Sequence, residues 1–139
     1  RNTALEYLGK DQYGKDMFLG GKNGYTSIKE GSWKCNRFVA DVAIEVGFSV
    51  PHNKTWTYGN VYPPVANDWA TGNNLPEWIH LGGTYPEPGF IAGRYKSPGP
   101  GHCGIVDYDG WTISARPYGV GRYARQMLDG TVKYNRPEE

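Results

Sequence analysis

Two β-rich runs near the end of the chain, at residues 102–108 and 111–116, restrict the fold more than any other feature. They flank Asp109-Gly110, a dipeptide favoured at the tip of a β-hairpin. Residues 90–95, after a Pro88-Gly89 turn, predict a further strand. Another run, over residues 130–136, predicts the last one. The second half of the chain is therefore expected to form an antiparallel sheet.

The strongest helical pattern lies between Ser32 and Gly47. Ser32 is a good N-cap residue and Gly47 a good C′ residue. Asp41 and Glu45 fall off the apolar face of this helix. Apolar residues recur at spacings of three and four, which places them on one side of the helix: Cys35, Phe38, Val39, Val42 and Val46.

The rest of the chain contains weaker signals. Thr3 and Glu6 form a capping box for a short helix that Gly9 can end, and residues 65–70 predict another short helix. Helices followed by strands indicate an α+β fold, with the helices packed on the antiparallel sheet. The 139 residues suit a single domain over residues 1–139.

Composition excludes several classes of function. The 15 Lys and Arg residues nearly balance the 14 Asp and Glu residues, without a basic run, so nucleic-acid binding is not expected. No apolar stretch is long enough for membrane insertion. His52, His80 and His102 lack zinc-site spacing, so we expect neither a metal nor a cofactor. The chain begins at Arg1, with no secretory signal, and is expected to be a processed form or a domain of something longer.

Cys35 is the first candidate for chemistry. With Ser32 as the N-cap, Cys35 is the third helical residue, where free N–H groups and the helix dipole favour a thiolate. The alternative is that Cys35 is a small buried apolar residue.

His102 opens a strand directly after a Gly/Pro-rich loop and can act as the base for such a thiol; otherwise it is an ordinary surface histidine. Cys103 should point to the opposite side of the strand. If His102 faces Cys35, Cys103 is expected to face away. A Cys35–Cys103 disulfide is the competing interpretation.

Ser114 is the candidate for orienting His102, and its position depends on the hairpin register. A two-residue Asp109-Gly110 turn puts Ser114 opposite Ile105, facing away from His102. A three-residue loop over 108–110 puts it opposite Gly104, on the side of His102. The alternative is a strand serine exposed to water.

These motifs resemble the NlpC and CHAP cysteine amidases of bacterial cell walls, which have a minimal papain-like fold. That family commonly reads D-C-S-G-[LF]-V at the cysteine and G-H-V-G-[IV] at the histidine, where this chain reads W-K-C-N-R-F-V and G-H-C-G-I-V. The NlpC branch has a third polar residue twelve positions after the histidine, which is Ser114 here. The resemblance covers most of the chain and supports the three-residue loop.

The chain also departs from the family pattern. Lys34 replaces the usual Asp or Asn before the cysteine, and Asn36-Arg37 replaces Ser-Gly after it. Phe90 replaces the Asp of a P-G-D motif, and Ser114 replaces His, Asn or Gln. The aromatic segment over residues 56–78 has no clear family equivalent. This divergence is similar to secreted antibacterial amidases, such as type VI secretion effectors and polymorphic-toxin domains.

The resemblance implies hydrolysis of an amide bond in the peptidoglycan stem peptide or cross-link. Cys35 would be the nucleophile and His102 the acid and base, with Ser114 orienting the histidine. Trp33, Asn36 and Tyr25 are the candidates for contacting substrate. The protein would be secreted or delivered to the bacterial periplasm and cell wall, where a cognate immunity protein would be its partner.

Two other functions fit the same residues. A deamidating or transglutaminase-like toxin would use the same Cys–His pair on a protein. A catalytically inactive module would bind glycan or protein through its aromatic loop. His52 and His80 are expected in surface loops, and Trp69 and Trp78 in the core or as loop anchors.

Overall fold

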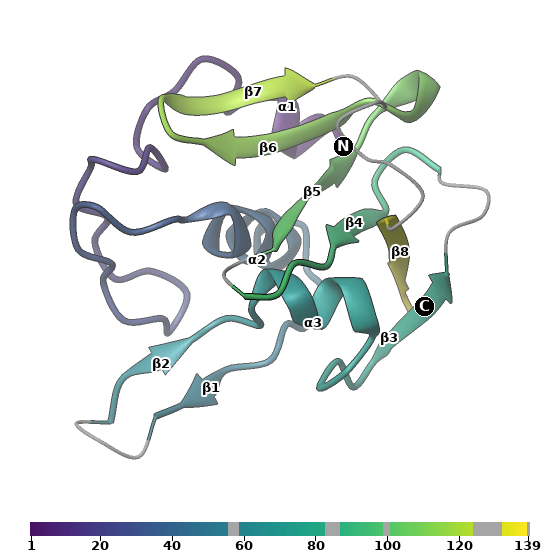
Figure 1. Ribbon diagram of the computed structural model, residues 1–139, viewed down its shortest axis with the longest axis horizontal. Coiled ribbons are helices and arrows are strands. Elements are labelled where there is room, and N and C mark those ends of the chain that lie inside the picture. Colours follow the sequence, from purple (N-terminus) through teal and green to yellow (C-terminus); the bar gives the residue numbers. More distant parts are fainter. Residues whose placement is uncertain (56–58, 83–86, 99–100, 124–131, 139) are drawn as a thin grey trace.

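The computed structural model describes residues 1–55, 59–82, 87–98, 101–123 and 132–138. It is an α+β fold built around an antiparallel sheet, as predicted (Figure 1). The helices are α1 (Asn2–Leu5), α2 (Cys35–Glu45), α3 (Ala66–Thr71) and the 3₁₀ turn η1 (Tyr108–Gly110). The strands are β1 (Asn53–Lys54), β2 (Val61–Tyr62), β3 (Trp78–Gly82), β4 (Ile91–Arg94), β5 (His102–Val106), β6 (Thr112–Arg116), β7 (Gly119–Tyr123) and β8 (Val132–Pro137).

The six-stranded sheet has the order β3-β8-β4-β5-β6-β7, and every neighbouring pair in it is antiparallel. The predicted strands over 90–95 and 130–136 are β4 and β8, although residues 130–131 lie outside the described part of the chain. Strands β1 and β2 form a separate two-stranded ribbon. Among the described residues, no helix is long and apolar enough to cross a membrane.

Two core clusters cover the two faces of the sheet. Because side chains alternate along a strand, Cys103 and Ile105 pack with α2 on one face. Ala92 and Val106 belong to the other cluster, on the face that we call the far face. Gly93 lets α3 approach β4 closely, since a Cβ there would lie 2.5 Å from the Ala70 nitrogen.

The hairpin has the three-residue loop. Ile105 pairs with Ile113 and Val106 with Thr112, which places Ser114 opposite Gly104. The Asp107 N–H donates to the Trp111 carbonyl at 2.6 Å, closing the loop. A Cβ on Gly104 would lie 2.9 Å from the Ser114 Cβ, so glycine leaves room for that side chain. This is the register in which Ser114 shares a face with His102.

Helix α2 begins later than expected. Lys34 is its N-cap residue, with φ −128° and ψ 14°, so Cys35 is the first helical residue and not the third. The Ser32 N-cap prediction is wrong, because the chain stays non-helical through Lys34. The end is as predicted: Gly47 has φ +99°, and its N–H donates to the Ile44 carbonyl in a Schellman-type ending.

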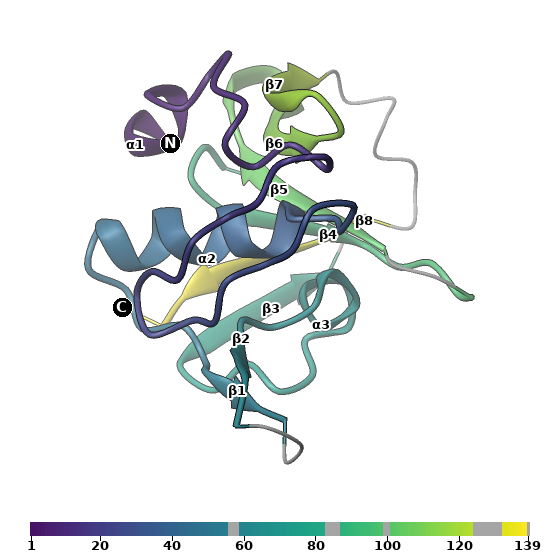
Figure 2. The ribbon, with the colours of Figure 1, turned by 90° about the vertical axis from the view of Figure 1, so that its left-hand side faces the viewer.

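Both sides of α2 are covered, which the sequence did not indicate. The segment over residues 10–33 crosses the side of α2 that faces away from the sheet (Figure 2). Asp41, expected off the buried face, is fully buried, whereas Glu45 is exposed. Asp41 was misplaced because periodicity identifies only the face toward the sheet and not a loop that covers the other side.

Helix α1 is shorter than expected. It ends at Leu5, its N-cap residue is Arg1, and no side chain caps it. The Thr3 capping box is therefore wrong, because Thr3 already lies inside the helix. Gly9 has φ +80°, and its N–H donates to the Val120 carbonyl on β7. The start of the chain is thus attached to the edge of the sheet.

Candidate active site

Cys35 lies where the start of α2 meets the start of β5. Cys103 and His102 are both close enough to its side chain to change the pKa of the thiol. Figure 2 shows the N-terminal end of α2 on the side where the β4–β5 loop projects. Cys35 is 5% exposed, and His102 is half-buried. One helix start and one strand start thus bring together a thiol, an imidazole and a second thiol.

The expectation that Cys103 faces away from Cys35 is wrong. Cys103 belongs to the core cluster under α2, and both cysteines are free thiols in the structure. Alternation along β5 does point His102 and Cys103 to different sides. However, His102 is the first residue of the strand, so it reaches Cys35 from the end of the sheet while Cys103 reaches it from the helix-facing side.

The pKa of the Cys35 thiol is held well below its usual value. The hydrogen bond from the Cys103 thiol is the largest cause; burial acts in the opposite direction, and the hydrogen bond and charge of His102 add to the lowering. Burial and the neighbouring Cys35 raise the pKa of Cys103 well above its usual value. These shifts favour Cys35, and not Cys103, as the thiolate of the pair.

Ser114 contacts the catalytic candidate His102 directly. Its hydroxyl oxygen lies 3.0 Å from His102 Nε2, and the serine is fully buried. With Nε2 next to Ser114, Nδ1 is the ring nitrogen left for Cys35. The structure therefore brings Cys35, His102 and Ser114 into one chain of contacts.

Lys34 fixes the start of α2, a role that sequence reasoning missed. Its side chain is 1% exposed. Its ammonium group donates to the carbonyls of Gly14, Lys15 and Ser32 at 2.9, 3.0 and 2.8 Å. Burial lowers the pKa of this group. Lys34 thus attaches the preceding loop to the start of α2, directly before Cys35.

Arg37 and Asp41 form a second buried attachment. Arg37 Nε lies 3.1 Å from an Asp41 carboxylate oxygen, with both side chains fully buried. Arg37 also donates to the carbonyls of Gly20 and Thr26, and Asp41 accepts from Tyr13 and Asn23. The i, i+4 spacing of the pair is a sequence signal for the ion pair. Nothing in the sequence indicates the loop carbonyls that complete it.

A groove of about 710 Å³ lies beside the start of α2 and includes two predicted substrate residues, Trp33 and Asn36. These two residues flank Lys34 and Cys35 in the sequence. Trp33 is 46% exposed, with Lys15 Nζ 4.5 Å from its ring centre. Cys35 does not line the groove. The other lining residues are Phe18, Thr26, Ser27, Ile28, Lys29, Ser32, Asn60, Tyr62, Pro63 and Val65.

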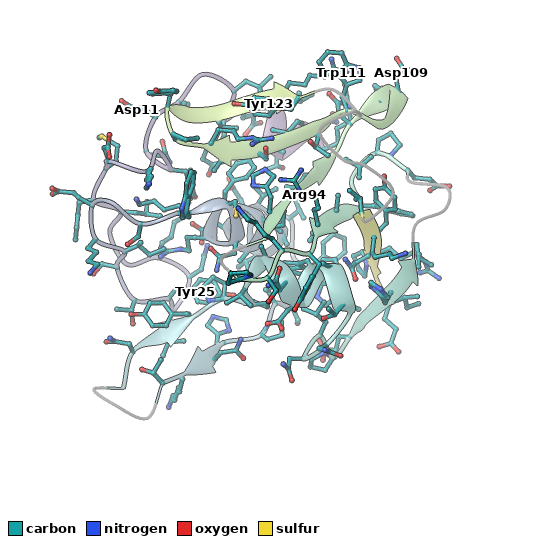
Figure 3. The ribbon with its side chains drawn as sticks, viewed as in Figure 1. Asp11, Tyr25, Arg94, Asp109, Trp111 and Tyr123 are labelled. Atoms are coloured by element: carbon teal, nitrogen blue, oxygen red, sulfur yellow. The ribbon has the colours of Figure 1, made fainter. Side chains whose placement is uncertain are left out.

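Tyr25, the third predicted substrate residue, lies apart from this groove. Its ring is 3% exposed and stacks on the ring of His52 at 4.3 Å between centres. Its hydroxyl donates to the Pro51 carbonyl. Figure 3 shows Tyr25 away from the strands that carry His102 and Ser114. These contacts hold the loop before α2 against the loop after it and leave the ring little surface for a substrate.

The other histidines are not part of the site. His52 lies in an exposed loop and contacts the Asn23 carbonyl. His80 is exposed too, but it lies on β3 and contacts Asn135. Trp69 is fully buried in the core, as expected, and packs edge-to-face on Trp78 at 4.9 Å. In the described ranges, no group of three His, Cys, Asp or Glu side chains could hold a metal ion.

No family model matches the chain, and neither a curated protein nor a solved structure matches it. The geometry of Cys35, His102 and Ser114 is therefore what bears on function.

Proposed function

We propose that the chain is a cysteine amidase with a papain-like arrangement, which cuts an amide bond in the peptidoglycan stem peptide or cross-link. The observation that carries the proposal is the contact chain at the start of α2. His102 helps to lower the pKa of the Cys35 thiol, and Nε2 of His102 contacts the hydroxyl of buried Ser114. A nucleophile, a base and an orienting group in hydrogen-bond contact are what acyl transfer requires.

In the first step, the Cys35 thiolate attacks the carbonyl carbon of the scissile amide. The negative charge moves to the carbonyl oxygen. As the first residue of α2, Cys35 has an N–H without a helical acceptor. That N–H can donate to the oxyanion, and the helix dipole favours the same charge.

In the second step, protonated His102 gives its proton to the leaving amine, and the C–N bond breaks to leave a thioester. Neutral His102 then takes a proton from water, which attacks the thioester and regenerates Cys35. Ser114 holds the imidazole ring in place through both steps. A serine hydroxyl carries no charge, so it orients the ring without adding the electrostatic stabilisation that a carboxylate would give to the imidazolium.

A cell-wall substrate is supported by the resemblance of the Cys35 and His102 motifs to cell-wall amidases and by the groove beside the start of α2. The groove opens next to Trp33 and Asn36, and its lining mixes aromatic, polar and cationic side chains. A peptide attached to a glycan offers groups for each of these. We further propose delivery to the periplasm of a target bacterium, with an immunity protein in the producing cell.

The experiment is digestion of purified Gram-negative peptidoglycan by the reduced chain and by Cys35→Ala. Released fragments are read by mass spectrometry. We expect new amine and carboxylate ends with the wild-type chain only, and the fragment masses identify the bond. Ser49→Ala, a change at an exposed serine outside the contact chain, is the matched control and should cut like wild type.

No cleavage by a folded, reduced wild-type chain would contradict the cell-wall substrate. A protein substrate can then be tested with the same variants. Deamidation would change the mass of the substrate protein by about one unit, and transglutamination would produce cross-linked protein. Unchanged binding of glycan or protein by Cys35→Ala, with no turnover of any substrate, would instead support an inactive binding module.

A further inference from the structure

An arginine on the far face of the sheet stands beside the candidate catalytic histidine. Arg116 follows Ser114 by two positions on β6, so both point to the same side of the strand. Continuing the register of Ile105 with Ile113 places Arg116 opposite His102. A second arginine, Arg94, is paired with His102 from β4. His102 is thus flanked by an arginine on each neighbouring strand.

The pKa of Arg116 is sensitive to several of its neighbours. Burial lowers the pKa of Arg116, and the charge of Arg94 lowers it further, while Tyr123 and the Cys35 sulfur raise it. Arg116 therefore lies within electrostatic range of both Arg94 and Cys35. Figure 3 shows Arg94 next to β5, with Tyr123 across β6 from it. An anion bound close to both guanidinium groups would reduce the repulsion between these like charges.

Among the described residues, Arg116 lacks the carboxylate partner that Arg37, Arg1 and Arg122 have. Arg37 is paired with Asp41, and both Arg1 and Arg122 with Asp107. The ring of Tyr123 lies 4.6 Å from the guanidinium carbon of Arg116. Within the described part of the chain, its buried Nε has no hydrogen-bond partner and no carboxylate forms an ion pair with it. A buried donor without a partner is costly and calls for a ligand.

We infer that Arg116, with Arg94 beside it, forms a subsite that binds a free carboxylate on a residue flanking the scissile amide. The inference rests on the proposed amidase function and specifies its substrate. Guanidinium is suited to this ligand because its planar donors match the two oxygens of a carboxylate. Both arginines and His102 are half-buried, so a substrate can reach them. The flat ring of Tyr123 supports the guanidinium from one side.

Stem peptides supply such carboxylates. Their glutamate is linked through its side chain, which leaves the α-carboxylate free, and a diaminopimelate residue carries a further one. The subsite would therefore distinguish stem peptides with free carboxylates from those in which the same groups are amidated. It would also exclude ordinary internal peptide bonds whose flanking residues carry no acid.

The test compares two synthetic stem tetrapeptides that differ only in a carboxylate or a carboxamide at the residues flanking the cut. We expect wild type to prefer the carboxylate in kcat/KM by about ten- to a hundredfold, the scale of charge-assisted hydrogen bonds. In Arg116→Gln that preference should shrink to within about twofold, and Arg116→Lys should retain part of it. Arg136→Gln removes a charge of the same sign on β8, where Arg136 pairs with Ile79 of β3, and should keep the full preference.

Equal kcat/KM for the two peptides in wild type would overturn the subsite and leave the amidase proposal intact. An unchanged preference for the carboxylate peptide in Arg116→Gln would have the same meaning. If wild type cleaves neither peptide, the amidase and the carboxylate subsite can still be tested separately. The binding of each peptide to Cys35→Ala is then measured by calorimetry. Tighter binding of the carboxylate peptide would then support the subsite and contradict the amidase. Equal or absent binding would overturn the subsite as well.

Discussion

His102 and Ser114, twelve residues apart in the chain, have their Nε2 and Oγ atoms 3.0 Å apart. The contact exists because the hairpin loop contains three residues and because Gly104, opposite Ser114, has no side chain to fill the space. A loop shorter by one residue would turn Ser114 to the other face. The geometry of the site is therefore decided at the hairpin tip, away from the nucleophile.

Ser114→Ala should lower kcat on peptidoglycan fragments by about ten- to a hundredfold, since losing an orienting group impairs general acid–base catalysis. KM should change much less, because Ser114 contacts the base and not the substrate. Ser114→Asn, which restores a hydrogen-bonding group of the family type, should recover part of the rate. Equal kcat for wild type and Ser114→Ala would rule out an orienting role.

Cys103→Ala should shift the titration of Cys35 to higher pH. The Cys103 thiol is the largest cause of the lowered pKa of Cys35. Its removal therefore raises that pKa, and the thiolate appears only at higher pH. The midpoint of the pH dependence of iodoacetamide alkylation measures the change. Cys103→Ser keeps a donor and should stay nearer wild type, and an unmoved midpoint in Cys103→Ala would show that Cys103 does not support the thiolate.

Asp41→Asn should destabilise the chain by about 3–5 kcal/mol, because it leaves the buried Arg37 charge without its counter-charge. Urea unfolding followed by tryptophan fluorescence measures the loss. The double variant Arg37→Met/Asp41→Leu removes both charges and should recover much of it. Glu45→Gln, an exposed position on the same helix, should change stability by less than about 0.5 kcal/mol. A similar small effect of Asp41→Asn would mean that the buried pair is not needed for folding.

Asp107 should make stability fall at acid pH. Burial alone would raise its pKa, but hydrogen bonds from Arg122 and Arg1 outweigh burial and lower it to about 2, from 3.8. The folded value lies below the unfolded one, so this stabilisation is present above about pH 4 and is lost as pH falls toward 2. Urea midpoints at pH 5, 3.5 and 2 should fall less steeply in Asp107→Asn than in wild type. Asp109→Asn, at an exposed position of the same turn, should follow wild type.

The sequence allowed the parts of the fold that depend on local pattern to be predicted. Alternation and the Asp109-Gly110 dipeptide located the hairpin, and spacing identified α2 and its end at Gly47. Strands β3 and β7 were missed. The first lies in an aromatic-rich stretch, and the second has Gly119 and Gly121 among its five residues, which hides the alternation.

The parts of the candidate site that depend on the spacing of motifs could be predicted from the sequence. The parts that depend on contacts between residues far apart in the sequence could not. Cys35, His102 and Ser114 follow from spacing and motif. The helix start was misplaced because Lys34, a poor capping residue by type, is held by carbonyls of a loop twenty residues away. Arg116 was missed for the same reason, since only the folded sheet places it next to His102.

The segment before α2 has a consequence for engineering this chain. Lys34 and Arg37 attach the carbonyls of residues 14, 15, 20 and 26 to the first turn of the helix that carries the nucleophile. A protease cut, domain insertion or circular permutation between residues 14 and 26 would interrupt the segment that carries these attachments. New termini are better placed in the exposed turn at residues 73–74, where no backbone carbonyl binds Lys34 or Arg37.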